Sequence, residues 1–192
     1  MTVSINTDIT FTANLYLDGL PVVLNQQRLQ QRLRSPRLTK REQLDAEVNL
    51  ADSRVASLLT LADHEHDEPL LLKFVAQGDR YAIHVVQRGM FDNARLAFEN
   101  KTHNLLASTA DKTDYFSINK LGVSSTTFSD IEFGAAYIGL VSESNNRPLY
   151  CNVVKGMSTF LNVNPNLSKH DAFNYSSAVF VIKVVEKLSA VT

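Results

Sequence analysis

Apolar and polar residues alternate over most of the chain, and short runs of β-branched and aromatic residues interrupt the alternation. Both patterns are typical of β-strands. The clearest such segments are 13–18, 21–25, 70–75, 80–86, 94–99, 115–119, 135–141, 148–154, 159–163 and 178–185. Residues that favour chain reversal separate them, as at Asp18-Gly19 and Asn145-Asn146. The pattern therefore predicts an all-β domain.

Residues 27–60 break this pattern. Gln, Arg and Leu are frequent at the start of the segment and favour a helix, in which Leu29 and Leu33 would share one face. Ser35-Pro36 should end that helix, because the residue before a proline disfavours helical geometry. Residues 54–61 fit either a strand or a helical turn. We therefore expect an irregular, partly helical insertion at about 27–60.

The predicted strands show a threefold order. In each of three units, one strand with a tyrosine comes first and one strand with a phenylalanine comes last. The tyrosines are Tyr16, Tyr81 and Tyr137, and the phenylalanines are Phe74, Phe116 and Phe180. The second and third units hold two further strands between these, so three four-stranded units would supply a closed barrel with a hairpin cap. In such a barrel the six aromatic side chains should fill the interior or its open end.

This order of apolar strands, with an aromatic residue in each closing strand, resembles the β-trefoil superfamily. The resemblance covers most of residues 10–187, with 27–60 as the part that does not fit. It implies three pseudo-repeats in a divergent branch, because the chain has no Trp for the Gln-x-Trp lectin motif and only Cys151 for the disulfides of the Kunitz-type branch. A β-sandwich such as a jelly roll is the alternative, since it would use the same alternating strands.

Composition limits the class of protein. A chain of 192 residues, 44% hydrophobic and 20% charged, suits a single domain over residues 1–192. A net charge of −1 does not favour nucleic acid as a partner. No apolar stretch is long enough to span a bilayer, and the first residues lack the pattern of a secretion signal. We expect a cytoplasmic protein, or one released without a signal peptide; the oligomeric state is not indicated.

Two clusters of charged residues can each be interpreted either as a binding site or as a solvated segment. Residues 64–68, HEHDE, would put His64 and His66 on one side of an extended segment, where a third ligand could complete a zinc site. No second ligand cluster is visible, so a polar turn is favoured and no metal or other cofactor is expected. The basic run 28–41 could contact phosphate, but no aromatic residue interleaves with it. A solvated insertion facing the acidic run 63–68 is favoured.

The sequence offers no recognisable catalytic motif. It has no G-x-S-x-G and no glycine-rich phosphate loop, and Cys151 lies in the apolar segment 148–154. We therefore predict no catalytic residues and a protein that is not an enzyme.

The resemblance implies a binding site in the loops that follow the opening strands, where lectin branches hold sugar hydroxyls with Asp and Asn and stack a sugar ring on an aromatic side chain. The candidate residues are Phe91, Asp92 and Asn93 in loop 87–95, and Asn145, Asn146, Arg147 and Tyr150 in loop 142–150. Asp and Asn are also common in plain turns, which is the alternative interpretation.

The expected function is therefore a lectin-like binding protein, with a glycan or cell-surface glycoprotein as partner. One alternative is a protein-binding or toxin-like module that uses residues 27–60 as its partner-specific element. A small hydrolase is the last alternative.

Overall fold

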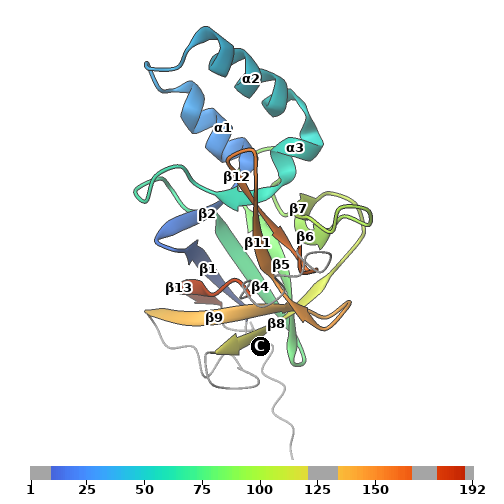
Figure 1. Ribbon diagram of the computed structural model, residues 1–192. Helices are drawn as coiled ribbons and strands as arrows, with labels where there is room; N and C mark the ends of the chain where they lie inside the picture. The colour runs from blue at the N-terminus through green and yellow to red at the C-terminus, as the bar shows by residue number, and fades with distance from the viewer. Residues whose placement is uncertain (1–9, 121–133, 166–176, 189–192) are drawn as a thin grey trace, which may run out of the picture.

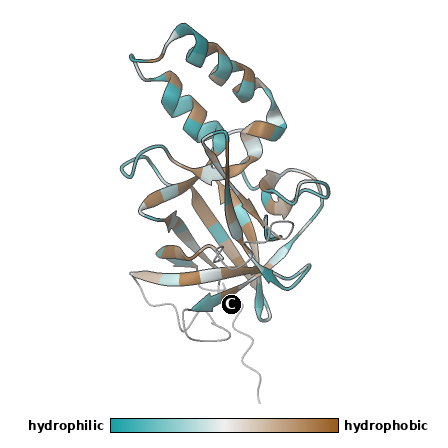
Figure 2. Cartoon of the chain, in the orientation of Figure 1, coloured by the Kyte–Doolittle hydropathy of each residue, from teal (hydrophilic) through white to brown (hydrophobic). Residues whose placement is uncertain are grey.

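The computed structural model describes residues 10–120, 134–165 and 177–188. β-Strands make up about half of this part of the chain, and three helices lie together at one end of it (Figure 1). Figure 2 shows that hydrophobic residues concentrate on the strands, whereas polar residues are frequent on the helices. The prediction of an all-β fold with a partly helical insertion is confirmed.

Six strands close into a barrel in which every neighbouring pair is antiparallel. In order around the barrel they are β1 (Thr10–Leu17), β4 (Leu71–Gln77), β5 (Arg80–Val86), β8 (Tyr115–Lys120), β9 (Ala135–Ser142) and β13 (Phe180–Leu188). The last strand, β13, pairs again with β1. Because the sheet closes on itself, the chain does not adopt the two-sheet sandwich that was the alternative.

Three pairs of shorter strands lie between successive barrel strands. They are β2 (Leu20–Leu24) with β3 (Leu59–Leu61), β6 (Arg95–Phe98) with β7 (Leu105–Ser108), and β11 (Tyr150–Val154) with β12 (Met157–Leu161). A two-residue strand, β10 (Arg147–Pro148), pairs with β9. Single bridges join Leu58 to Leu106 and Asn104 to Leu161, so the three pairs meet in space.

The helices are α1 (Asn25–Leu33), α2 (Lys40–Ala51) and α3 (Ser53–Ser57), all between β2 and β3. Helix α1 ends just before Ser35-Pro36, as predicted. Helix α2 begins with a capping box, in which Thr39 Oγ1 accepts from the Glu42 amide and Glu42 Oε2 accepts from the Thr39 amide. The insertion is therefore more regular than predicted. Residues 54–61 form both of the alternatives that the sequence left open, first α3 and then β3.

Aromatic side chains fill the barrel. The rings of Phe11 and Phe74 stack with their centroids 4.8 Å apart, and Tyr81 meets both rings edge-on. Phe116 and Phe180 are also buried and pack against other aromatic rings. A buried aromatic side chain of this kind contributes about 1.5–3 kcal/mol through removal of its surface from water.

The predicted inward position of the opening tyrosines is wrong for two of the three. Tyr81 is buried, but Tyr16 is only half-buried and 62% of Tyr137 is exposed. Successive side chains on a strand point to opposite faces. Because Leu15 and Ile138 occupy the interior, their neighbours Tyr16 and Tyr137 must point outward.

Candidate binding groove

Helix α1 carries a polar stripe. Gln27, Gln30, Gln31 and Arg34 lie at positions i, i+3, i+4 and i+7, which fall on one face of a helix. Leu29 is buried on another side of α1. The helix therefore presents three amides and a guanidinium group along one line.

Two arginines attach α1 to the connection between β3 and β4. Arg28 Nε donates to Asp63 Oδ1 at 2.8 Å, and Arg32 donates to both oxygens of the same carboxylate. Arg28 is 8% exposed and also reaches the carbonyl oxygen of Gly156 at 3.5 Å. The basic run thus meets the first residue of the acidic run 63–68, as the sequence predicted.

The carboxylate of Asp63 is held in its ionised form. Partial burial alone would raise the pKa of Asp63, but the hydrogen bonds from Arg32 and Arg28 outweigh burial, and the pKa lies below its ordinary value. The two arginines and the single carboxylate therefore act as a charged clamp between α1 and the barrel.

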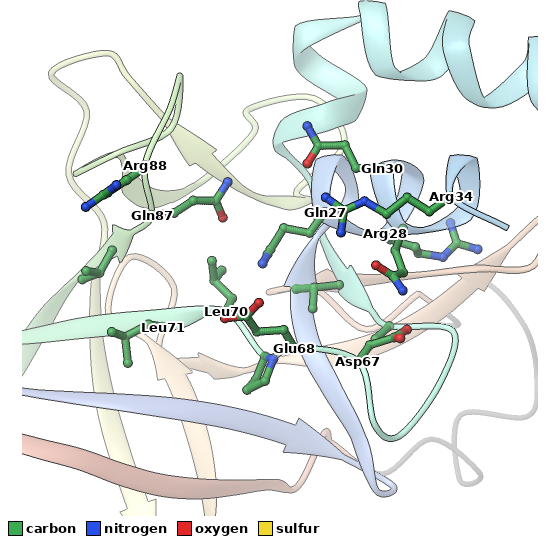
Figure 3. A pocket seen from close by; sticks show the side chains of 15 residues that line it. Gln27, Arg28, Gln30, Arg34, Asp67, Glu68, Leu70, Leu71, Gln87 and Arg88 are labelled. Atoms are coloured by element: carbon green, nitrogen blue, oxygen red, sulfur yellow. The ribbon is translucent and has the colours of Figure 1, made fainter.

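A hollow of about 460 Å³ lies beside α1 (Figure 3). One wall is the polar stripe of the helix, the second is the segment 67–71, and the third is the segment 86–88, which includes the last residue of β5. Aliphatic residues contribute to the lining as well. They are Val23, Ala62, Leu70, Leu71 and Val86. The hollow therefore combines aliphatic surface with convergent amide, guanidinium and carboxylate groups, a combination found in small-molecule sites.

One wall of this hollow carries a polar atom without a partner. Gln87 Nε2 donates to Gln26 Oε1 at 3.2 Å, but Gln87 Oε1 is buried and accepts no hydrogen bond from the described residues. An unsatisfied buried acceptor costs about 1–3 kcal/mol.

A second hollow, of about 550 Å³, adjoins the first and shares Gln31, Arg34 and Asp67 with it. Its other lining residues are Arg32, Ser35, Leu38, Glu42, Asp63 and His64. The carboxylates here already accept intramolecular hydrogen bonds, since Glu42 caps α2 and Asp67 Oδ2 accepts from the His64 amide at 3.1 Å. We call the two hollows together the α1 groove.

The run HEHDE forms the turn that the sequence favoured. His64 and Asp67 close it through two hydrogen bonds of 3.1 Å, one in each direction. His66 and Glu65 are exposed and approach each other to 3.4 Å. Among residues 10–120, 134–165 and 177–188, no group of three or more His, Cys, Asp or Glu side chains is arranged to hold a metal ion.

In the first candidate loop, the structure uses the proposed residues to build the turn. Phe91 is 3% exposed and belongs to the core, so its ring is not free to stack on a ligand. Asp92 Oδ1 accepts from the amide of Gln87 at 3.4 Å. Asn93 has a φ of 59°, a left-handed geometry that Asn tolerates better than most residues.

The second candidate loop is organised in a similar way. Asn145 Oδ1 accepts from the Arg147 amide at 3.2 Å, and Asn145 Nδ2 donates to the Asn162 carbonyl oxygen at 2.7 Å. Asn146 has a φ of 53°, Arg147 is exposed in β10, and Tyr150 is half-buried at the start of β11. None of the seven candidate residues lines either hollow of the α1 groove.

Cys151 is half-buried, and burial raises the pKa of its thiol. A raised pKa leaves little thiolate near neutral pH, so the thiol is a poor nucleophile there.

The groove was not among the sites predicted from the sequence, although the sequence contains two signals for it. The spacing of Gln27, Gln30, Gln31 and Arg34 marks one polar face of α1. Gln87 begins the candidate loop 87–95, whereas the predicted binding residues of that loop lie nearer its other end. What the sequence does not provide is the contact between these two segments, because that contact depends on how the barrel closes.

No model of a protein family matches the chain, and neither a curated protein nor a solved structure does so. Within the described ranges, no helix combines the length and the apolar character needed to cross a membrane.

Proposed function

We propose that this chain is a binding protein of the β-trefoil type that acts without catalysis and recognises a glycan in the α1 groove. The order of the strands supports the trefoil assignment. The first and fourth strands of each proposed unit would be the barrel strands, namely β1 and β4, β5 and β8, and β9 and β13. The paired strands β2–β3, β6–β7 and β11–β12 would be the three hairpins.

The convergence of side-chain amides on one hollow is the observation that carries the proposed binding function. Gln27, Gln30 and Gln31 of α1 line the hollow of about 460 Å³, and Gln87 lines it from another segment. Sugar hydroxyls donate and accept hydrogen bonds, so they match side-chain amides. The aliphatic surface of Leu71 and Val86 can pack against the C–H groups of a sugar ring.

The groove is a better site than the loops that the sequence favoured. In those loops Asp92 and Asn145 already accept backbone hydrogen bonds, and Phe91 lies in the core. In the groove, the described residues provide no ion pair or side-chain hydrogen bond for Gln30 or Arg34. Polar groups without an internal partner are the ones that a ligand can engage at least cost.

A glycan array followed by calorimetric titration with the sugar it selects tests the proposal. Gln87→Ala removes one of the amide side chains that line the hollow and should weaken binding about tenfold, the effect of losing one hydrogen bond worth about 1.4 kcal/mol. Asn49→Ala is the matched control, because Asn49 is an exposed amide on α2 outside both hollows. It should bind as the native protein does.

Three results would contradict the proposal in different ways. Loss of binding in Asp92→Ala or Asn145→Ala, with Gln87→Ala unaffected, would move the site to the loops. Silence across the array would exclude a glycan ligand. Turnover of a substrate, abolished by one side-chain substitution, would show an enzyme.

Protein binding through the helical insertion is the second candidate function. Leu44 and Val48 lie one turn apart on α2 and are 48% and 70% exposed. Within the described chain α2 packs mainly on α1 and α3, so its outer face is open to a partner. A protein ligand whose binding is lost in Leu44→Ser with Val48→Ser, and retained in Gln87→Ala, would favour this function.

A further inference from the structure

We propose that the ligand of the α1 groove is an extended oligosaccharide that lies along α1 and occupies both hollows. This inference rests on the proposed glycan-binding function and adds the length and direction of the ligand.

The polar stripe of α1 indicates the direction in which the ligand lies. From Gln27 to Arg34, the residue that caps the end of α1, the chain advances seven residues, or about 10 Å at 1.5 Å per residue. Gln30 lies beside the first hollow only, whereas Gln31 and Arg34 lie beside both. The stripe therefore borders both hollows, which adjoin at Gln31, Arg34 and Asp67.

The size of the two hollows indicates the length of the ligand. Sites for whole small molecules measure about 300–1,000 Å³. The hollows, of about 460 and 550 Å³, each reach that size, so a single sugar bound near Gln87 would leave the second hollow open. His64 and Ser35 lie there, within reach of a longer chain.

The chemistry of the walls favours an oligosaccharide over a peptide. An extended peptide is recognised mainly through main-chain hydrogen bonds along a strand edge, with pockets for alternate side chains. The wall formed by α1 provides neither, because the backbone groups within a helix bond to one another. It provides side-chain amides at regular intervals, which suit hydroxyl groups along the edge of a sugar chain.

The test titrates the full chain with homo-oligosaccharides of one to six units of glucose, galactose, mannose and N-acetylglucosamine. For the sugar that binds, affinity should rise at least about tenfold from one unit to three or four and then level off. Gln30→Ala should weaken binding of both the single sugar and the oligomer, since Gln30 lines the first hollow. His64→Ala should weaken binding of the oligomer several-fold and leave the single sugar unchanged.

Equal affinity for one unit and six units would overturn this inference and leave the proposed glycan-binding function standing. A longer oligomer that binds more tightly with no effect of His64→Ala would also overturn it, because the extra units would then lie outside the second hollow. Failure of every sugar to bind would reject the proposed function itself. Asn49→Ala again serves as the control and should match the native protein at every length.

Discussion

Arg28 and Asp63, 35 positions apart in the sequence, are joined by a hydrogen-bonded ion pair with 2.8 Å between Nε and Oδ1. The pair connects the helical insertion to the strand connection that leads into β4. Arg28 is almost completely buried, whereas the Asp63 side chain is 25% exposed. The position of α1, and hence the shape of the groove, depends on this ion pair and on the second ion pair, between Arg32 and Asp63.

Asp63→Asn should therefore destabilise the protein. The substitution leaves the buried Arg28 guanidinium without its counter-charge. Loss of one partner from a fully buried pair costs about 3–5 kcal/mol, and because Asp63 is partly exposed and Asn keeps an acceptor oxygen we expect about 2 kcal/mol. Urea unfolding measures the change. Asp45→Asn is the control, since the pair of Asp45 with Arg41 is exposed and should contribute less than about 0.5 kcal/mol.

The contribution of Asp63 should depend on pH. Its pKa in the folded protein lies below the ordinary value of 3.8, so between the two values the unfolded chain binds more protons. The stabilisation is then complete above the ordinary pKa and is lost as the pH falls through the folded value. The difference in unfolding free energy between the native protein and Asp63→Asn should stay constant from about pH 7 to pH 5 and shrink below about pH 4. A difference that grows on acidification would contradict the assignment.

The strands could be predicted from the sequence because alternation is a local property. Segment 80–86 was predicted as a strand and is β5 with the same bounds. Alternation indicates which residues share a face, but it does not indicate which face lies inside the barrel. This is why Tyr137 was misplaced. The sequence predicts one or two short helices in the insertion but does not give the bounds of α2, because α2 buries only Ala46 and so lacks an apolar stripe, although Thr39 and Glu42 form a recognisable capping box.

The candidate site was harder to predict than the fold. Gln30 and Gln87 are distant in the sequence and line one hollow because the fold brings α1 beside the residue that follows β5, where Gln87 donates a hydrogen bond to Gln26. Asp92 and Asn145 are predicted as binding residues because Asp and Asn bind hydroxyl groups. The same residue types also stabilise turns, and in both loops these two residues do so. The residue types alone do not distinguish these two roles.

Replacing a buried aromatic residue and replacing an exposed one should have sharply different effects on the free energy of unfolding. Phe74→Ala removes a fully buried ring that stacks on Phe11, and should cost about 3–5 kcal/mol. Tyr137→Ala removes a largely exposed ring and should change stability by no more than about 0.5 kcal/mol. Thermal and urea unfolding of the two variants measure this. A large loss in Tyr137→Ala would mean that the outer face of β9 is covered in solution.

The turn formed by HEHDE should be indifferent to chelators. Its closing contacts are the hydrogen bonds between His64 and Asp67, in which the backbone of His64 takes part and its imidazole does not. Addition of EDTA should therefore leave the melting temperature unchanged, both in the native protein and in His64→Ala with His66→Ala. A fall in melting temperature on chelation that is absent from the double variant would show that the two imidazoles hold a metal ion, and the polar-turn interpretation would be wrong.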